Sequence, residues 1–477
     1  MQTNKALKGV IWSALERFSF QGVQFAVSII LARLLTPNDF GLVAIVLVFS
    51  TIFQTINESG LNTALVYKLD RDDIDYSTAF YANIAIGVAS YLLLYFAAPF
   101  IADFYRNSSL ISVMRILSLN LIINSFGLVQ VAKYTINVDF KTQAKATLIA
   151  AVISGAIGIS VAYITHSVYS IVAQQLSNSF VYVSLMWIFA KWVPLFTFSI
   201  QRFKLLFLYA YKLIIARVIS VVFDDIYSLA IGKLYNPSAL GFYNRAMSFR
   251  QILSKNIIGI VQRVSIPLLC QDQDNHDRMR KTLLRFMDTT ALFVYPLLAG
   301  LMILSKPLVH VLLGEAWLRT ADMLILGCPA GFFYLISTFN RNVFNATGRT
   351  DLALKTEIVK KMIFVCIFLL TMRYKLEVLL IGLIIISIIE MIIDVFMTKK
   401  QIGLRFRDEL LSLLPILGAC LIMCLFIAPV ILFFHSSISQ LIVGFAIGVL
   451  SYSTICYIFN VSDFRILLHG IINKTSK

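Results

Sequence analysis

The segment Ile30-Leu-Ala-Arg-Leu-Leu-Thr-Pro-Asn-Asp-Phe-Gly41 occurs twice in the chain, the second time as Ala230-Ile-Gly-Lys-Leu-Tyr-Asn-Pro-Ser-Ala-Leu-Gly241. The shared positions are Leu34, Pro37 and Gly41, which recur as Leu234, Pro237 and Gly241, and Arg33, which becomes Lys233. Over residues 13–45 only five positions are identical, so the placement of the copies is the better argument. Each copy ends an apolar run and enters a short polar turn, which predicts two related halves.

The runs around these copies have the composition of membrane spans. Of the 477 residues, 59% are apolar and 14% are charged, whereas a soluble domain averages roughly 45–50% apolar and about 25% charged residues. This excludes an ordinary soluble enzyme, and the 37 Phe and 20 Tyr exclude a disordered chain. A helix needs ~20 residues to cross the hydrocarbon layer. We therefore predict an all-α polytopic membrane protein with fourteen transmembrane helices, at residues 10–34, 40–64, 79–103, 110–132, 146–165, 168–190, 207–233, 243–267, 286–311, 321–345, 356–372, 376–398, 410–432 and 439–460.

The positive charges are unevenly divided between the predicted connections. With the N-terminus inside, the inner segments hold 26 Lys and Arg residues and the outer segments hold eight. Because short cytoplasmic loops are enriched in Lys and Arg, both termini are predicted to be cytoplasmic. The net charge of +16 then indicates contact with an anionic membrane surface, not with nucleic acid.

Six spans separate the two copies of the repeat, and this even number gives both halves the same orientation. Such parallel repeats are related by a pseudo-twofold axis along the membrane normal, and substrate binds between the halves. We predict four parts: an N-terminal lobe of helices 1–6 at 1–190, a cytoplasmic linker at 191–206, a C-terminal lobe of helices 7–12 at 207–400, and helices 13–14 with a cytoplasmic tail at 401–477.

Polar and cationic side chains recur on single faces of several spans. Arg17, Gln21 and Gln24 share one face of span 1, and Arg217 occupies the matching place in span 7. An Arg in hydrocarbon costs at least ~2.5–3.5 kcal/mol, so it faces a bundle interior or a watery cavity. Guanidinium groups bind phosphate in bidentate fashion, which predicts an anionic substrate. The predicted substrate-binding residues are Arg17, Gln21, Gln24, Arg217, Arg250, Lys255 and Arg341. The alternative is a structural role, for example Arg17 paired with Glu16 or extended to the cytoplasmic surface.

Acidic residues in the spans have two interpretations. Asp224, Asp225 and Glu58 are candidates for binding a coupling proton or cation, or they neutralise a neighbouring Arg or Lys. Glu390 and Asp394 share a face near the inner end of span 12. There we expect them to pair with a Lys of span 11, either Lys360 or Lys361.

Catalytic and metal-binding patterns are not predicted. The six Cys and five His residues are scattered without the spacing of a zinc site or a disulfide framework. The segment Leu69-Asp-Arg-Asp-Asp-Ile-Asp75 contains Asp-x-Asp, a metal motif of glycosyltransferases, but membrane glycosyltransferases keep that motif on an outer loop. Since the charge distribution places this segment inside, we expect a solvated loop.

One run reads Ser59-Gly-Leu-Asn-Thr-Ala-Leu-Val-Tyr-Lys-Leu-Asp-Arg71 and is followed by Asp75-Tyr-Ser-Thr-Ala-Phe-Tyr81. It resembles the connection between spans 2 and 3 of Wzx-type polysaccharide flippases, most closely the branch that includes the colanic acid exporter. The further matches, which extend the resemblance over about residues 5–400, are Leu240-Gly-Phe-Tyr-Asn-Arg-Ala246, Val261-Gln-Arg-Val264, Leu313-Gly-Glu-Ala-Trp317 and Asn345-Ala-Thr-Gly-Arg349.

The resemblance implies the multidrug/oligosaccharidyl-lipid/polysaccharide exporter superfamily, with a MATE-like fold of two six-helix bundles around a central cationic cavity. It further implies two added helices, 13 and 14, and an undecaprenyl-diphosphate-linked oligosaccharide as substrate. Such a protein flips its substrate to the outer face of the bacterial inner membrane for polysaccharide biosynthesis. Membrane lipids, and a polysaccharide polymerase with its assembly proteins, are the expected partners. No cofactor is expected, and a proton or sodium gradient is the expected energy source.

Two other functions remain open on the sequence. A multidrug/cation antiporter of the same fold would usually have twelve spans and an acidic cavity, and this chain has fourteen predicted spans and basic stripes. A membrane polymerase or ligase would have a large outer loop with catalytic residues, and the outer loops here are short. The flippase is the favoured function, and no enzymatic activity is predicted.

Overall fold

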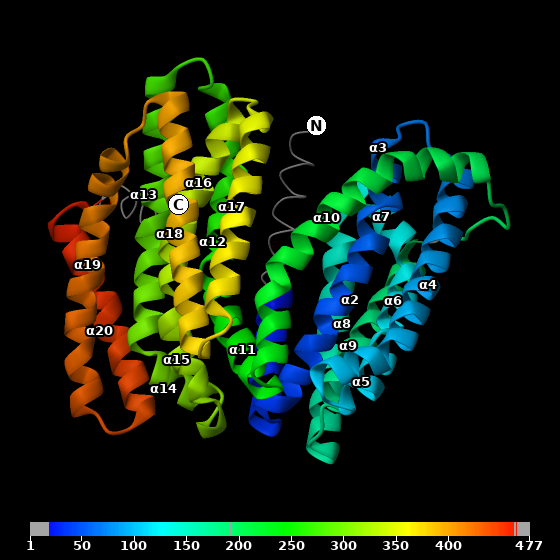
Figure 1. Ribbon diagram of the computed structural model, residues 1–477, viewed down its shortest axis with the longest axis horizontal. Coiled ribbons are helices and arrows are strands. Elements are labelled where there is room, and N and C mark those ends of the chain that lie inside the picture. The colour runs from blue at the N-terminus through cyan, green and yellow to red at the C-terminus, as the bar shows by residue number, and fades with distance from the viewer. Residues whose placement is uncertain (1–18, 191, 462–463, 465–477) are drawn as a thin grey trace, which may run out of the picture. The chain divides into compact units, whose positions relative to one another are not determined.

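The computed structural model describes residues 19–190, 192–461 and 464. Within these ranges the chain forms helices and no β-strand (Figure 1), so the all-α prediction is confirmed. Two compact units divide the chain, residues 1–241 and 242–477. Each unit is described by itself.

The first unit is a helical bundle in which α8 and α9 form a tightly packed antiparallel pair (Figure 1). It also contains α10, which packs against α2, α3 and α4. The boundary predicted at 191–206 between two lobes stays a prediction. The helices of this unit are Ser19–Leu34, α2 (Pro37–Ser59), α3 (Leu61–Tyr67), α4 (Asp73–Tyr105), α5 (Ser109–Leu117), α6 (Leu119–Ser125), α7 (Leu128–Ile136), α8 (Phe140–Thr165), α9 (Tyr169–Ala190) and α10 (Ile200–Leu234).

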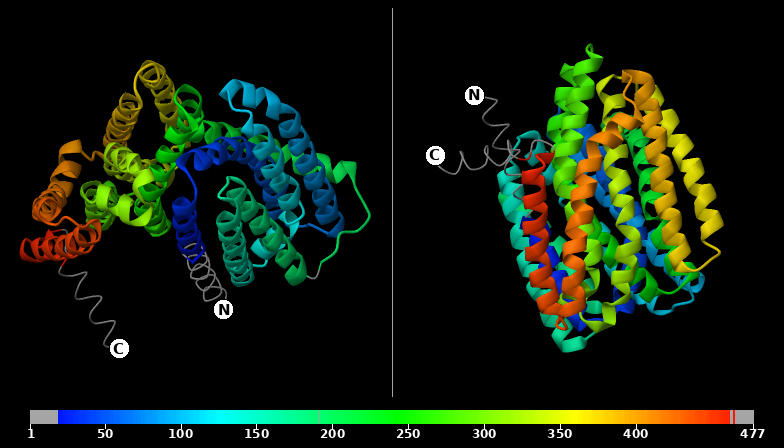
Figure 2. Two further views of the ribbon diagram at one scale, coloured as in Figure 1. Left: turned by 90° about the horizontal axis from the view of Figure 1, so that it is seen from below. Right: turned by 90° about the vertical axis from the view of Figure 1, so that its left-hand side faces the viewer.

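The second unit packs α16 against α12, α13 and α18, and α13 against α19. At its edge, α19 and α20 form an antiparallel hairpin (Figure 2). The elements of this part are α11 (Pro237–Leu253), which begins at the end of the first unit, α12 (Lys255–Gln271), α13 (His276–Ile303), α14 (Ser305–Leu312), η1 (Glu315–Trp317), α15 (Arg319–Gly327), α16 (Pro329–Ala346), α17 (Thr350–Thr371), α18 (Leu376–Ile402), α19 (Phe406–Phe433) and α20 (Ser437–Ile458).

The described residues contain nine helices that are long and apolar enough to cross a membrane, or up to eleven if each of two bent pairs is one span. The bends are 43° between Ser109–Ser125 and Leu128–Ile136, and 42° between Glu315–Gly327 and Pro329–Ala346. Proline explains the second bend, because Pro329 lacks the N–H that would continue the preceding helix and instead begins α16. Every predicted span falls on one helix or on consecutive helices in its described part, and the total of fourteen stays a prediction.

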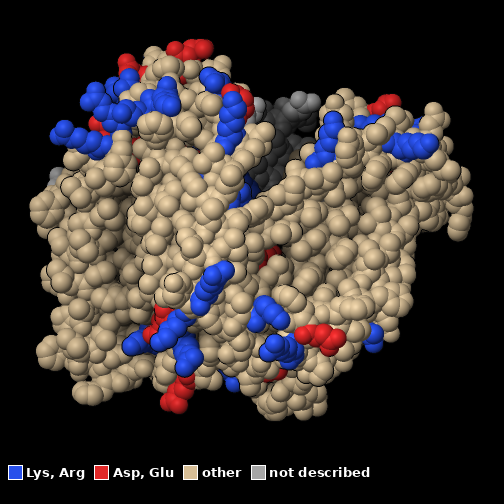
Figure 3. All heavy atoms as spheres, viewed as in Figure 1, with Lys and Arg blue, Asp and Glu red and all other residues tan. Residues whose placement is uncertain are grey.

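The surface has the charge distribution of a membrane protein. On the face seen in Figure 3, Lys, Arg, Asp and Glu gather at the two ends of the helices, and the belt between them is largely uncharged. Large apolar side chains such as Phe96, Phe100, Leu425 and Phe433 are exposed. Soluble proteins rarely expose contiguous apolar patches larger than a few hundred Å². Together with the apolar helices, this shows a multi-pass membrane protein.

The two copies of the repeat begin helices in the same way. Thr36 caps α2, since its hydroxyl accepts from the backbone N–H of Asp39 and the Asp39 carboxylate accepts from the N–H of Thr36. In the second copy the Asn236 side chain accepts from the N–H of Ala239 at 2.7 Å. In both copies a proline occupies the first helical position, where its missing N–H is not needed.

These two helix starts also meet each other through their glycines. A Cβ atom on Gly41 would lie 1.7 Å from the carbonyl oxygen of Pro237, and one on Gly241 would lie 2.0 Å from the carbonyl oxygen of Pro37. Only glycine permits this backbone-to-backbone approach. The contact is reciprocal, because the glycine of each copy meets the proline of the other.

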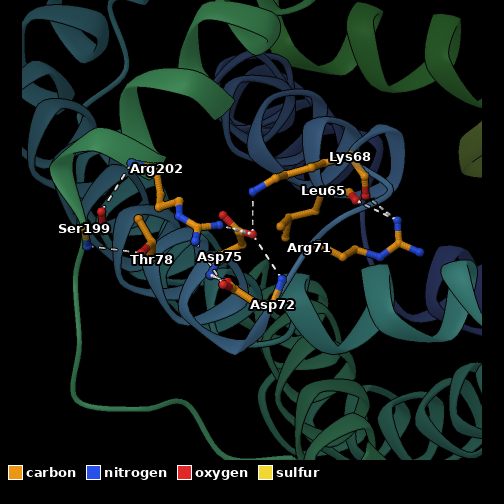
Figure 4. Close-up of polar contacts among 8 residues, drawn as sticks. All are labelled: Leu65, Lys68, Arg71, Asp72, Asp75, Thr78, Ser199 and Arg202. Atoms are coloured by element: carbon orange, nitrogen blue, oxygen red, sulfur yellow. Dashed lines mark hydrogen bonds and ion pairs between the residues drawn. The ribbon is translucent and has the colours of Figure 1, made fainter.

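At one end of the first unit, a cluster of ion pairs fixes the start of α10. We call this cluster the clasp; it consists of Lys68, Asp72, Asp75 and Arg202. Figure 4 shows Lys68 and Arg202 pointing toward the Asp75 carboxylate from opposite sides. Lys68 Nζ lies 2.6 Å and Arg202 Nη1 2.9 Å from Asp75 Oδ2, and Arg202 Nη2 lies 3.0 Å from Asp72 Oδ2. The expectation of a solvated loop holds for the exposed Leu69 and is wrong for Asp75, which is completely buried because it pairs with both cations.

Backbone contacts extend the clasp to the segment before α10. The N–H of Leu195 donates to Ser77 Oγ at 2.9 Å, and the N–H of Ser199 donates to Thr78 Oγ1 at 3.2 Å. Side-chain hydroxyls of α4 thus bind a segment more than one hundred residues away in sequence. The predicted linker at 191–206 is therefore attached to the first unit along much of its length.

Asp72 is the titratable cap of α4 in the clasp. The backbone N–H of Asp75, and then the Arg202 guanidinium, hold the pKa of the Asp72 carboxyl below its ordinary value. A lowered pKa means that the stabilising charge is present above the ordinary Asp pKa and is lost as the pH falls through the lowered one. The Asp72 carboxyl is therefore charged at neutral pH.

Replacing Asp75 with Asn is expected to loosen the clasp. The variant keeps the shape of the side chain but loses two charge-assisted hydrogen bonds, which are worth about 1.5–3 kcal/mol each before the partly exposed Lys68 and Arg202 are hydrated again. The midpoint of thermal unfolding in detergent should fall clearly below that of the wild type. Asp70→Asn, at an exposed position of the same loop, is the control and should leave the midpoint unchanged. Equal midpoints for both variants would contradict the structural role of Asp75.

Candidate functional site

The predicted binding residues of the first unit that the structure describes lie on the helix Ser19–Leu34 and on α10. Arg17 lies outside the described residues. Gln24 Oε1 accepts a hydrogen bond from Gln174 Nε2 of α9 at 2.8 Å, and Gln21 is one turn earlier and partly buried. Arg217 is exposed on α10. The structure therefore links Gln24 to α9, and the proposed pairing of Arg17 with Arg217 stays a prediction.

Arg217 has an acidic neighbour that the sequence did not indicate. It interacts electrostatically with Glu58 near the end of α2, and Gln54 Nε2 donates to Glu58 Oε1 at 2.5 Å. The helices are close here, because a Cβ atom on Gly60 would lie 2.8 Å from the Ile214 side chain. Glu58 can thus balance the charge of Arg217 when no anion is bound.

The two other acidic candidates lie farther along α10. Asp224 is exposed, and Asp225 is partly buried and has an interaction of its own. Asp224 follows Arg217 by seven residues, which places both on one face of the helix. Their role in ion coupling stays a prediction.

A cavity of about 570 Å³ with both polar and apolar lining residues lies in the first unit, between α2–α3, α6–α7 and α9. We call it the amide pocket, because Gln54, Asn62, Asn124 and Asn178 line it. Glu58, a predicted ion-coupling residue, also lines it, whereas its amides were not among the predicted site residues. The signal was present in α9, where Gln174, Asn178 and Tyr182 recur at i, i+4 and i+8 on one helical face.

In the second unit, α16, α17 and α18 share a buried charged network. Lys360 Nζ lies 2.5 Å from Asp394 Oδ1 and 3.4 Å from Glu357 Oε1, and Ser337 donates to Asp394. Arg341 Nη1 lies 3.1 Å from the same Glu357 oxygen. The expected pair between Asp394 and a Lys of span 11 is confirmed, with Lys360 as the partner. Arg341, a predicted substrate ligand, is held here by Glu357.

The remaining two predicted cations differ in their surroundings. Arg250 Nη1 donates to the carbonyl oxygen of Gly327 at 3.0 Å, and this carbonyl is one of those left without an intrahelical partner at the end of α15. Lys255 is exposed at the first position of α12. The Arg250 side chain is therefore held by a hydrogen bond to α15, whereas the Lys255 side chain is accessible.

A second cavity, of about 810 Å³, lies in the second unit between α13–α16 and α19. We call it the apolar groove, because side chains such as Tyr295, Phe332, Leu413, Leu417 and Leu421 form almost its whole lining. Its charged lining residues are Lys306 and Glu409. A groove of this kind suits a hydrocarbon chain and offers few partners to a polar ligand.

Metal binding has no geometric support in the part of the chain that the structure describes, where no three His, Cys, Asp or Glu side chains gather in a suitable arrangement. The six cysteines are free thiols.

Comparison with known proteins agrees with this architecture. A family model described as "Polysaccharide biosynthesis protein" matches residues 30–322. Teichuronic acid biosynthesis protein TuaB of Bacillus subtilis is 26% identical over 74% of this chain and 73% of its own length. The succinoglycan biosynthesis transport protein ExoT of Rhizobium meliloti is 25% identical over 70% and 67%. Lipopolysaccharide biosynthesis protein WzxC of Escherichia coli is 22% identical over 93% and 88%.

Solved structures share the fold at low sequence identity. The lipid II flippase MurJ in its inward closed conformation superposes with a TM-score of 0.76 at 17% identity, over 96% of this chain and all of MurJ. An inward-facing MATE multidrug transporter gives a TM-score of 0.62 at 14% identity, over 82% and 98%. The chain thus shares the fold of MurJ and of this MATE transporter. Since the family model spans more than half of the sequence, the chain belongs to the polysaccharide biosynthesis protein family.

Proposed function

We propose that this protein flips undecaprenyl-diphosphate-linked oligosaccharide repeat units across the bacterial inner membrane by alternating access. The product would serve the biosynthesis of an O-antigen, a capsule or an exopolysaccharide. The observation that carries the proposal is the apolar groove beside α19, since a long polyprenyl tail requires an apolar surface. Burial of such a tail gains roughly 25 cal/mol per Å² of surface removed from water.

The relatives support a transport role in polysaccharide assembly. ExoT is named as a transport protein, and MurJ, which shares the fold, is named as a flippase. We infer that the chain has no enzymatic activity and that both termini are cytoplasmic. A polysaccharide polymerase and assembly proteins are the proposed partners.

The diphosphate would bind to guanidinium groups of the first unit. In this proposal Arg17 and Arg217 each donate two parallel hydrogen bonds to a phosphate group. Glu58, which interacts with Arg217, balances the cation before substrate arrives.

Arg217→Ala is expected to weaken substrate binding by about ten- to a hundredfold. Charge-assisted hydrogen bonds are worth roughly 1.5–3 kcal/mol each, and ~1.4 kcal/mol is a factor of ten. Arg217→Lys should restore only part of the lost affinity. Lysine keeps the positive charge but lacks the paired N–H donors of the guanidinium group. The measurement is restoration of polysaccharide export in cells lacking the transporter, at matched protein levels. Lys212→Ala, an exposed cation on the same helix, is the control. Full export by Arg217→Ala would remove this residue from the site.

Asp224 is our candidate for coupling to a proton or sodium gradient. Alternating access requires a ligand that binds the two states with different affinity. Asp224→Asn is therefore expected to reduce export and to change its dependence on the external ion. Unchanged export with the same ion dependence would show that Asp224 is structural, and Asp225 and Glu58 would be examined next.

A further inference from the structure

The amide pocket differs chemically from every other part of the proposed site. Its lining combines the amides of Gln54, Asn62, Asn124 and Asn178 with hydroxyls such as that of Ser179. Among the described residues Glu58 is its charged lining group, and no Lys or Arg lines it. A pocket without cations does not suit a diphosphate, and a hydrocarbon tail would leave its four amides without hydrogen-bond partners.

Amides and hydroxyls match the hydrogen-bonding pattern of a sugar. Each sugar hydroxyl donates one hydrogen bond and accepts others, and each amide offers two donors and an acceptor at fixed spacing. The volume of about 570 Å³ lies within the range of small-molecule pockets, roughly 300–1,000 Å³. Tyr182 adds an aromatic ring with a hydroxyl to the wall.

A second layer of polar residues orients the pocket side chains. Asn178 Nδ2 donates to Ser154 Oγ at 3.1 Å, and Asn83 Nδ2 donates to Asn62 Oδ1 at 3.3 Å. Asn83 is completely buried. Each of these contacts occupies one hydrogen-bonding position of a lining amide and fixes the plane of that amide. Side chains fixed in this way pre-organise a binding site.

The pocket lies toward the end of the unit where the clasp is found. Thr135 of α7 lines it, and the neighbouring Lys133 places its Nζ 4.5 Å from the centre of the Tyr76 ring, next to Asp75 in sequence. The distribution of Lys and Arg predicts that this end faces the cytoplasm. Lipid-linked oligosaccharide is loaded from that side in the proposed function.

We propose that the amide pocket binds a sugar ring of the oligosaccharide headgroup while the substrate is loaded. The assignment rests on the proposed function and deepens it, because it separates the sugar site from the sites of the diphosphate and the tail. The first unit then contributes to selectivity for the glycan. The apolar groove binds the polyprenyl tail equally well, whichever glycan the tail carries.

The test compares two probes on the purified full chain in detergent. The first probe is lipid-linked oligosaccharide extracted from a host strain that lacks the transporter, and the second is undecaprenyl diphosphate without sugar. The variant is Asn124→Ala with Ser179→Ala, two lining residues on facing helices. The control is Asn137→Ala with Thr165→Ala, at exposed positions of the same unit. Native mass spectrometry gives the affinity for each probe.

We expect the pocket variant to bind the oligosaccharide probe about tenfold more weakly and undecaprenyl diphosphate within twofold of the wild type. Retained binding of undecaprenyl diphosphate also shows that the variant is folded. Ser179→Phe, which fills the pocket, should give the same selective loss. Unchanged affinity for both probes, or equal losses for both, would overturn the pocket assignment alone. Failure of the wild type to bind either probe would contradict the proposed function itself.

Discussion

Lys360→Met is expected to destabilise the second unit by about 3–5 kcal/mol, the cost of leaving a buried charge without its partner. Lys360 is 2% exposed and Asp394 is completely buried, and their charged atoms lie 2.5 Å apart. Removing the ammonium leaves the Asp394 carboxylate with the Ser337 hydroxyl as its remaining close partner. Unfolding in detergent, followed by circular dichroism, would measure the loss.

The adjacent lysine provides the matched control. Lys361 is partly exposed, and Lys361→Met should change the unfolding midpoint only slightly. The double variant Lys360→Met with Asp394→Leu should recover most of the stability, because an apolar pair of similar volume often replaces a buried ion pair without loss. A Lys360→Met protein as stable as the wild type would show that the pair is not formed.

Gly41→Ala is expected to force apart the two helix starts that contain Gly41 and Gly241. The new Cβ atom would lie 1.7 Å from the Pro237 carbonyl oxygen, well inside van der Waals contact, and backbone atoms cannot move aside as a flexible side chain can. Overpacking of this kind costs typically 1–3 kcal/mol and occasionally more. The unfolding midpoint should fall.

Two comparisons separate this contact from a general effect of glycine. Gly241→Ala should behave like Gly41→Ala, and the double variant should cost less than the sum, since one displacement relieves both clashes. Gly418→Ala is the control, because its Cβ atom meets no atom within 4 Å and alanine favours a helix interior by roughly 0.5–1 kcal/mol. Additive losses at Gly41 and Gly241 would contradict the reciprocal contact.

Features set by local sequence were predictable. The apolar runs predicted the positions of the helices, and the repeat predicted the two turns next to which α2 and α11 begin. A pair between span 12 and a Lys of span 11 was predictable, because Glu390 and Asp394 share a face (i, i+4) near the inner end of span 12. The structure decides between the two lysines and the two acids, since it pairs Lys360 with Asp394.

Features that join distant segments were not predictable from one sequence. Arg202 and Asp75 are 127 residues apart, and nothing in the local pattern of either indicates the other. The interaction of Arg217 with Glu58 similarly depends on how α10 packs against the end of α2. The bends between helices were missed as well, because a single Gly or Pro within an apolar run is compatible with a continuous span.

The most direct test of the proposed function is flipping by the purified chain in proteoliposomes. Extracted lipid-linked oligosaccharide with a radiolabelled sugar is incorporated into both leaflets, and a membrane-impermeant glycosidase is added outside. The account predicts that the chain exposes the protected, inner-leaflet sugar to cleavage with time, and that Arg217→Ala slows this exposure. Cleavage that stops at the outer-leaflet fraction, as in liposomes without protein, would contradict the account.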